Sequence, residues 1–166
     1  MEPTDRDLAA AFLAGDESAF HTLYDRHAPM LFAFATRLAG QDDAGDVLQE
    51  AWLGAATSLR SFRWTSTLRS WLCGIVVNCA RKRWRQARRP EALPDESTWY
   101  DATPAQIDLE RAIAKLSPRY REVLLLHDVH QFTHEEIAEM LSIDAGTSKS
   151  NTARARAAMR EMLEGR

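Results

Sequence analysis

Apolar residues recur at intervals of three and four along most of this chain, a spacing typical of amphipathic helices and not of strands. The cleanest example runs from residue 44 to residue 59, where one face is apolar and the opposite face is polar. Shorter apolar stripes lie at residues 8–12 and 20–38, and a long helix is expected over residues 68–89. The first half of the chain is therefore predicted to be a helical bundle.

Residues that favour helix caps mark the boundaries in this half. Thr4 and Asp7 have the spacing of a capping box, in which each side chain accepts a hydrogen bond from the other residue's backbone. Gly15 and Gly40 stand where the first two helices are expected to end, since glycine readily adopts left-handed conformations. Pro29 lies inside the second stripe and predicts a kink or a split, because proline has no amide hydrogen to donate.

The second half of the chain predicts shorter helices and ends in two helices joined by a turn. Thr103-Pro104 and Ser117-Pro118 each combine a capping residue with proline at the first helical position. Thr133 and Glu136 form a second capping box that opens a short helix. A turn follows, and Thr147 is expected to cap a longer final helix. A short helix, a turn and a longer helix rich in Arg, Lys, Ser and Asn form the helix-turn-helix pattern.

Length and composition narrow the class of protein. The 166 residues allow one domain or two small ones, and 45% apolar with 27% charged side chains is the balance of a folded globular protein. No apolar run approaches the roughly 20 residues of a membrane span, and residues 1–14 lack the features of a signal peptide. We therefore expect a cytoplasmic protein without stable membrane insertion.

The net charge of −3 hides strong segregation along the chain. Residues 1–58 carry three basic and ten acidic side chains, residues 59–89 carry nine basic and no acidic ones, and residues 90–110 carry six acidic and no basic ones. A solvated helix face is the simplest interpretation of the basic segment. Interleaved tryptophans favour single-stranded nucleic acid instead, since bases stack on rings while phosphates meet cations. These tryptophans are Trp64, Trp71 and Trp84.

The final helix is a candidate reader of duplex DNA. In a helix-turn-helix, the first residues of the second helix meet base edges in the major groove, and later cations meet phosphates. An Asn amide in that position can form two hydrogen bonds to adenine. An ordinary helical hairpin with a charged face is the alternative. The candidate DNA contacts are Thr147, Lys149, Ser150, Asn151, Arg154, Arg156 and Arg160.

Three stretches of the chain resemble one known family. LSPRYREVLLLHDVHQFTHEEIAEMLSIDAGTSKSNTARARAAM (116–159) is similar to region 4 of sigma-70-type transcription initiation factors of the extracytoplasmic-function (ECF) group. DAGDVLQEAWLGAATSLRSF (43–62) and STLRSWLCGIVVNCARKRW (66–84) are similar to region 2 of the same group. The matches follow the family's order and together cover nearly the whole chain.

The resemblance implies an all-α fold of two small domains and a role in transcription initiation. Residues 1–89 would form a region 2-like helical bundle, residues 104–166 a region 4-like helix-turn-helix domain, and residues 90–103 an acidic linker. The protein would bind core RNA polymerase, direct it to promoters through their −10 and −35 elements and promote strand opening, with no catalysis of its own. An anti-sigma factor is an expected further partner, because members of the family are often held inactive by one.

Site residues follow from the resemblance position by position. The helix at 43–59 would dock on the clamp helices of the largest polymerase subunit, and an acidic face suits a basic partner. The docking residues are Asp46, Gln49, Glu50 and Leu53. The loop at 62–67 and the helix after it would recognise and open the −10 element, partly by stacking an extruded base on Phe62 and Trp64. The −10 residues are Phe62, Arg63, Trp64, Asn78, Arg81, Lys82 and Arg85, and the final helix would read the −35 element.

The chain departs from the family at several positions. Where the family usually has an aliphatic residue, an Arg and a Leu, this chain has Ser148, Asn151 and Thr152. Positions 148 and 152 lie one turn apart on the side expected to face the first helix of the motif. Hydroxyls there reduce apolar burial and predict a weakened or partner-dependent −35 reader. Gly74 and Val77 stand where the family often has Arg, which removes two cations from the basic face.

Other classes of function need features that the sequence lacks. A stand-alone helix-turn-helix DNA-binding regulator is the main alternative, but it gives residues 43–84 no role. A helical interaction module without nucleic-acid binding is another. A metal hydrolase would need a motif such as HExxH, and Ala138 stands where the second histidine would follow His134.

The remaining histidines and the cysteines do not indicate a cofactor. His127 and His130 precede the helix break at Thr133, so they are not expected to share a metal site with His134. Cys73 and Cys79 lack the CxxC spacing of a zinc or redox site and are interpreted as small apolar residues. We expect no cofactor and no metal.

Overall fold

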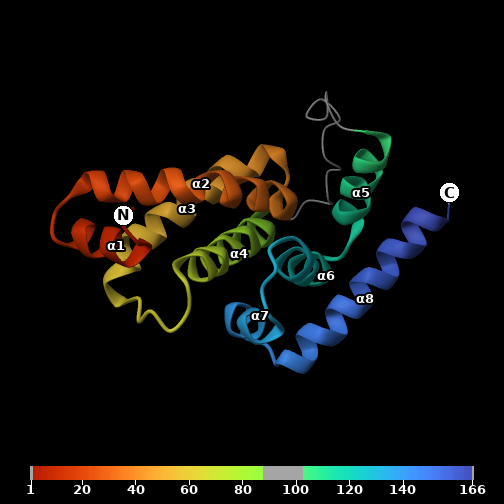
Figure 1. The fold of residues 1–166 in the computed structure, drawn as a ribbon. Coiled ribbons are helices and arrows are strands. Elements are labelled where there is room, and N and C mark those ends of the chain that lie inside the picture. Colours follow the sequence, from red (N-terminus) through yellow and green to blue (C-terminus); the bar gives the residue numbers. More distant parts are fainter. Residues whose placement is uncertain (1, 88–102, 166) are drawn as a thin grey trace.

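Two groups of helices lie side by side, one from each half of the chain (Figure 1). The computed structural model describes residues 2–87 and 103–165, and all regular structure within these ranges is helical. The predicted all-α fold class is therefore confirmed. The linker expected at 90–103 falls outside the described residues except for Thr103.

The N-terminal lobe, residues 2–87, is a bundle of four helices built around the second one. This helix, α2, contacts each of the other three, and Leu23, Leu31 and Phe34 on its inward face are almost fully buried. Burial of large apolar side chains at helical spacing is what holds such a bundle together. The helices are α1 (Asp5–Leu13), α2 (Glu17–Ala39), α3 (Gln41–Ser58) and α4 (Leu68–Ala87), with a short 3-10 turn at Leu59–Ser61.

The predicted boundaries in this lobe are largely confirmed. The amide of Asp7 donates to Thr4 Oγ1 at 3.2 Å and the amide of Thr4 donates to Asp7 Oδ2 at 3.0 Å, which completes the capping box. Gly15 and Gly40 follow the first two helices with φ of +105° and +88°, conformations that favour glycine.

The split considered at Pro29 does not occur. A single helix runs from Glu17 to Ala39 with Pro29 inside it. The segments on both sides of the proline are anchored by buried residues, including Leu23 and Leu31, and this packing outweighs the one hydrogen bond that proline cannot make.

The C-terminal lobe, residues 103–165, is arranged along its last helix. This helix, α8, contacts α5, α6 and α7, and Figure 1 shows it as a long blue element on one side of the lobe. Its inward residues Ala155 and Met159 are buried. The elements are α5 (Pro104–Lys115), α6 (Pro118–Leu124), a π-helical segment (Leu125–Val129), α7 (His134–Leu141) and α8 (Ala145–Glu164).

The helix-turn-helix predicted from the sequence is present as α7, a turn and α8. Its opening capping box is confirmed, since the amide of Glu136 donates to Thr133 Oγ1 at 3.2 Å and that of Thr133 donates to Glu136 Oε2 at 2.8 Å. The second helix begins earlier in the chain than predicted. Asp144 has the extended backbone of an N-cap residue, so α8 starts at Ala145 and Thr147 lies in its first turn.

Candidate polymerase and promoter interfaces

The four predicted docking residues lie together on the outer face of α3. Asp46, Gln49, Glu50 and Leu53 follow the i, i+3, i+4, i+7 spacing, which places them on one side of a helix. Leu53 is 64% exposed, more than the other exposed large apolar side chains among the described residues. An acidic surface with an exposed leucine suits a partner that offers both positive charge and an apolar contact. We call these four residues the docking face.

The docking face is linked to α4 by ion pairs that the sequence did not indicate. Arg83 Nη2 lies 2.6 Å from Asp46 Oδ2, and Arg83 Nε donates to Asp43 Oδ1 at 3.0 Å. Lys82 pairs with Glu50. These partly exposed pairs hold α3 against α4 and add little stability each. A basic partner can therefore compete for the same carboxylates with little loss of folding stability.

The loop before α4 holds a cluster of aromatic rings. Phe62 stacks on Trp71 with ring centroids 4.7 Å apart and an interplanar angle of 20°, and its centroid is 4.8 Å from that of Trp64. Trp64 has φ of +57°, a left-handed conformation that bulky residues rarely adopt. The guanidinium of Arg6 lies 5.6 Å from the Trp64 ring, and Arg63 is exposed. Phe62 and Trp64 are both half-buried, so each keeps part of its surface open to a stacking partner.

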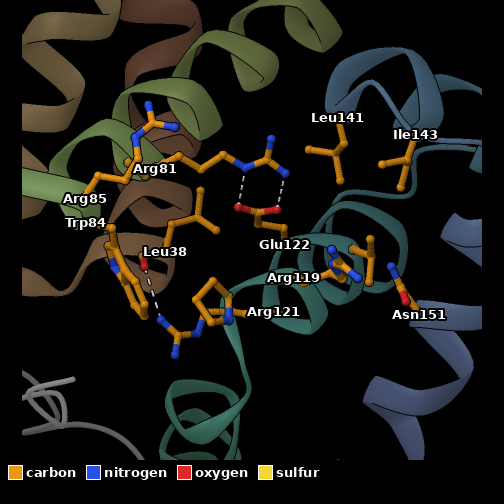
Figure 2. Close-up of a pocket in the computed structure, with 13 residues that line it drawn as sticks. Leu38, Arg81, Trp84, Arg85, Arg119, Arg121, Glu122, Leu141, Ile143 and Asn151 are labelled. Atoms are coloured by element: carbon orange, nitrogen blue, oxygen red, sulfur yellow. Dashed lines mark hydrogen bonds and ion pairs between the residues drawn. The ribbon is translucent and has the colours of Figure 1, made fainter. Parts of the chain in front are cut away.

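Four of the predicted −10 residues form one stripe along α4. Asn78, Lys82 and Arg85 are exposed, and Arg81 occupies the same face. Arg81 is half-buried because its guanidinium forms two hydrogen bonds to Glu122 of α6, at 2.8 and 2.6 Å (Figure 2). We call Asn78, Arg81, Lys82 and Arg85 the cationic stripe.

Most of the predicted −35 residues point outward from α8. Lys149, Ser150, Arg154 and Arg160 are exposed, and Thr147 is half-buried. Arg156 is also exposed but pairs with Asp128, to which it donates at 2.8 and 2.5 Å. The Arg156 guanidinium lowers the pKa of the Asp128 carboxyl, with a smaller contribution from His127.

Asn151 does not fit the predicted contact with adenine. Its side chain is buried, with 3% exposed, and its Nδ2 has no hydrogen-bond partner among the described residues. It lines a pocket of about 500 Å³ between the two lobes (Figure 2). Asn151 directly follows the exposed Ser150, but successive helix residues point about 100° apart, so its side chain faces inward. An amide on this side of α8 cannot reach a base edge in this arrangement.

Ser148 and Thr152 are buried, as the sequence predicted, but their hydroxyl groups have partners. Ser148 Oγ lies 2.9 Å from Nδ1 of His134, the first residue of α7. Thr152 Oγ1 donates to the carbonyl oxygen of Ser148 at 2.9 Å. The Thr152 hydroxyl is dispensable. Its partner, the Ser148 carbonyl oxygen, is an acceptor, so a substitution that removes the hydroxyl leaves no buried donor without a partner.

Thr152→Val is expected to stabilise the full-length chain by about 1 kcal/mol, because it buries a methyl group in place of a hydroxyl. For a chain of this length that corresponds to a rise in Tm of roughly 3 °C. Thermal melting followed by circular dichroism measures the change. Thr22→Val is the matched control, since exposed Thr22 makes the same bond one turn back, to Ser18. A lower Tm for Thr152→Val, or an equal rise in the control, would contradict this account of the burial.

The three histidines of the C-terminal lobe, His127, His130 and His134, are divided between two environments. His127 and His134 stack with centroids 4.3 Å apart, whereas His130 is buried against Phe34 of α2, with centroids 4.8 Å apart. In residues 2–87 and 103–165 there is no cluster of three or more His, Cys, Asp or Glu that could hold a metal ion. The sequence did not predict the burial of His130, which is 6% exposed.

His130 should make the folded chain sensitive to mild acid. Burial lowers its pKa to about 4 from an ordinary value of 6.5, and the positive charges of Arg69 and Arg37 contribute. As the pH falls, the unfolded chain therefore binds a proton near pH 6.5, whereas the folded chain does not bind it until about pH 4. The free energy of unfolding falls as the pH falls through this interval.

Between about pH 7.5 and pH 5 this histidine should remove about 2 kcal/mol of unfolding free energy. Denaturant titrations of the wild type and of His130→Phe measure the difference. The variant cannot titrate and keeps an aromatic ring beside Phe34. If both proteins lose the same free energy over this range, the proposed role of His130 in acid sensitivity is wrong.

The cysteines show no sign of reactivity. Cys73 is fully buried, and burial raises the pKa of its thiol to about 12, so it stays protonated at neutral pH. Burial also raises the pKa of Cys79.

Within the part of the chain that the structure describes, none of the helices has the length and apolarity needed to cross a membrane.

A four-helix lobe with an acidic docking face, followed by a helix-turn-helix lobe, is the architecture of a two-domain sigma factor. Residues 23–90 match the family model of sigma-70 region 2, and residues 106–159 match that of sigma-70 region 4. The chain belongs to the ECF group of the sigma-70 family of RNA polymerase sigma factors. Proteins of this family are transcription initiation factors that give RNA polymerase its promoter specificity.

Named relatives match over nearly the full chain. The ECF RNA polymerase sigma factor SigM of Mycobacterium tuberculosis is 36% identical over 169 residues, which cover 98% of this chain and 86% of that protein. The ECF RNA polymerase sigma-E factor of Haemophilus influenzae is 31% identical over 183 residues, covering 98% and 95%.

Two solved structures share the arrangement of helices. The sigma factor RpoE of Bartonella quintana, in complex with the anti-sigma factor NepR, has a TM-score of 0.74 at 30% identity and covers 87% of this chain and 96% of its own. CnrH, in complex with the cytosolic domain of CnrY, has a TM-score of 0.76 at 25% identity and covers 97% of each chain.

Proposed function

We propose that this chain binds core RNA polymerase through the docking face, recognises the −10 element with the N-terminal lobe and the −35 element with the C-terminal lobe, and promotes strand opening between them. The observation that carries the proposal is the combination, in one chain and in the family's order, of an exposed acidic face, a cationic stripe and a helix-turn-helix. A stand-alone DNA-binding regulator would use only the last of these.

Docking on the clamp helices of the largest polymerase subunit is supported by the chemistry of α3. Among the described residues, the carboxylates of Asp46 and Glu50 pair with the partly exposed cations Arg83 and Lys82. Leu53 is 64% exposed and supplies an apolar centre among them. Charged rims with an apolar centre are typical of specific protein interfaces.

Recognition of the −10 element is supported by the aromatic loop and the cationic stripe. Half-buried Phe62 and Trp64 offer ring surface for an extruded base, and exposed Arg63 adjoins them. Along α4, Lys82 and Arg85 can meet the phosphates of the separated strand. The strained backbone of Trp64 is the kind of feature that clusters at binding sites.

Recognition of the −35 element as duplex is supported by the outward residues at the start of α8. Lys149 and Ser150 lie in its first two turns, where a recognition helix meets base edges, and Arg154 and Arg160 follow at positions suited to phosphates. Asn151 is left out of this set because it is buried.

An anti-sigma protein is the expected regulatory partner. The related structures of RpoE and CnrH were solved with NepR and the cytosolic domain of CnrY, respectively. We assign the units as residues 1–89 for polymerase and −10 binding, 90–103 as linker and 104–166 for −35 binding.

Gel-shift titration with and without core polymerase tests the proposal against a stand-alone regulator. Core polymerase plus this chain should retard a promoter fragment from a selected library at nanomolar concentrations, while the chain alone should not. Sequence-specific retardation by the chain alone, unchanged by polymerase, would contradict the proposal and favour the regulator.

A further inference from the structure

We propose that His127 and His134 form a proton-binding pair in the −35 interface, and that duplex DNA binds the protonated pair more tightly than the neutral one. This pair adds two DNA-contacting residues to the proposed function, on which the inference rests. Promoter binding then takes up a proton and becomes tighter in mild acid. We call His127 and His134 the histidine pair.

The histidine pair links the segment before the helix-turn-helix to the start of its first helix. His127 belongs to the π-helical segment, and His134 is the first residue of α7. Their rings stack with centroids 4.3 Å apart and an interplanar angle of 15°. Both side chains are half-buried, so each ring keeps part of its surface in contact with solvent. Protons and an external ligand can therefore reach the pair.

The pair lies beside residues of the predicted −35 set. His134 Nδ1 lies 2.9 Å from Oγ of Ser148, which directly precedes the exposed Lys149 near the start of α8. On the other side, Arg156 Nη2 lies 3.4 Å from Nδ1 of His127. In a helix-turn-helix the second helix lies in the major groove while the first crosses the DNA backbone. A phosphate near the start of α7 is therefore expected to pass close to the pair.

Hydrogen bonds within the protein engage one nitrogen of each ring. His127 Nδ1 lies 2.6 Å from Oδ1 of Asp128, and an ionised carboxylate only accepts, so this Nδ1 carries a hydrogen. His134 Nδ1 is engaged by the Ser148 hydroxyl. Within the described part of the chain, Nε2 of neither ring has a hydrogen-bond partner. Both Nε2 atoms are therefore available to a ligand from outside.

Protonation changes Nε2 of His127 from an acceptor into a donor. In the neutral ring with its hydrogen on Nδ1, Nε2 carries a lone pair, which repels the oxygens of a phosphate. A further proton binds at Nε2 and gives an N–H that can donate to a phosphate oxygen, with the added attraction of a positive charge. A protonated His134 likewise donates to Ser148 from Nδ1 and outward from Nε2. DNA should therefore bind the protonated form preferentially.

The surroundings oppose protonation of His134 in the absence of DNA. Burial lowers the pKa of His134 below its ordinary value of 6.5. Neighbouring positive charges contribute in the same direction, and Glu135 opposes them. These positive charges are on His127, Lys149 and Arg156.

The two rings share the proton unequally with their neighbours. The charged groups that face His127 are Asp128 and Arg156, which also pair with each other. Two positively charged rings whose centroids lie 4.3 Å apart would repel each other. The pair should therefore take up one proton more readily than two, as coupled groups do.

DNA reverses the balance of charge around the pair. Phosphates placed against Lys149 and Arg156 neutralise the cations that oppose protonation and add negative charge of their own. The pKa of His134 should therefore rise when −35 DNA binds. A group whose pKa is higher in the complex makes binding tighter as the pH falls. The gain begins as the pH falls through the pKa of the complex and is complete below the pKa of the unbound protein.

Promoter binding at controlled pH tests the inference. The complex of this chain with core polymerase is titrated with a fluorescent promoter fragment at pH 7.5 and at pH 5.5, at one ionic strength. His127→Gln/His134→Gln removes both titrating rings and keeps side-chain amides that can bond Asp128 and Ser148. The wild type should bind about threefold or more tightly than this variant at pH 5.5, and within about twofold of it at pH 7.5.

Two controls separate a contact with DNA from a structural effect. His21→Gln removes an exposed histidine of α2 and should leave the pH dependence of the wild type unchanged. A fragment that ends downstream of the −35 element keeps the −10 contacts but lacks the duplex that the pair would meet. The wild type and the double variant should bind this fragment equally at both pH values. Circular dichroism at each pH checks that every protein is folded.

A fixed charge at position 134 gives a second readout. His134→Arg should bind the full promoter fragment about threefold more tightly than the wild type at pH 7.5, and its affinity should depend less on pH. His21→Arg, the same substitution away from the pair, should show neither effect.

Equal pH dependence of the wild type and the double variant on the full fragment would overturn the inference. So would an equal difference between them on the fragment without the −35 element. If the complex shows no specific promoter binding with any of these proteins at either pH, the proposed function fails, and the inference fails with it.

Discussion

Glu50→Arg should reduce co-purification of the protein with core polymerase at least tenfold while leaving it folded. The change removes an attraction to a basic partner and introduces a repulsion, and tenfold corresponds to only about 1.4 kcal/mol of binding free energy. The fold should tolerate it, because the Glu50 side chain is 41% exposed and its pair with Lys82 is a surface contact of small value.

The matched control for this experiment is Asp25→Arg. It reverses an exposed carboxylate of the same lobe, on α2 and away from the docking face. Tagged core polymerase is used to capture each variant, and thermal melting checks that each is folded. Undiminished capture of folded Glu50→Arg, or an equal loss for the control, would show that α3 is not the docking surface.

Removing cations from α4 should weaken promoter opening and flatten its dependence on salt. Each lost phosphate contact lowers the slope of log affinity against log salt by about one unit. Arg81→Ala/Arg85→Ala should therefore reduce the slope by about two. Glu122→Gln is included in the variant, because the Glu122 side chain is only 7% exposed and its carboxylate would otherwise be buried without its partner.

The control carries Glu122→Gln with Lys115→Ala, which removes an exposed cation at the end of α5. Binding to a promoter fragment by the complex with core polymerase is measured over a range of salt concentrations, and opening is followed by permanganate reactivity of unpaired thymines. A slope equal to that of the control would mean that the cationic stripe does not contact DNA.

Local sequence signals predicted most of the secondary structure because they act over a few residues. The capping boxes at Thr4 and Thr133 each need only a residue three positions ahead, and both formed. The split considered at Pro29 failed because the local loss of one hydrogen bond is smaller than the packing on both sides of it. Thr147 was a good cap by type, but Asp144 has the backbone conformation that starts the helix.

The contacts between the lobes could not be read from the sequence. Arg81 looked like any other member of a basic run, and nothing local pairs it with Glu122, which is 41 residues away. His130 was considered only as a metal ligand, and its packing against Phe34 of the other lobe has no local signal. Asn151 had the right type and position for base recognition, but helical phase turns it inward. Gly74 was noted only as a missing cation. Its close approach to Met140 of α7 could not be predicted, because it depends on how the two lobes pack.

Run-off transcription with purified core polymerase that lacks any other sigma factor tests the central claim most directly. With a library of promoter fragments, adding this chain should produce discrete transcripts from a subset that shares one −10 and one −35 sequence at fixed spacing. If folded protein yields no transcripts beyond those of core polymerase alone on any template, the chain is not acting as a promoter-specificity subunit.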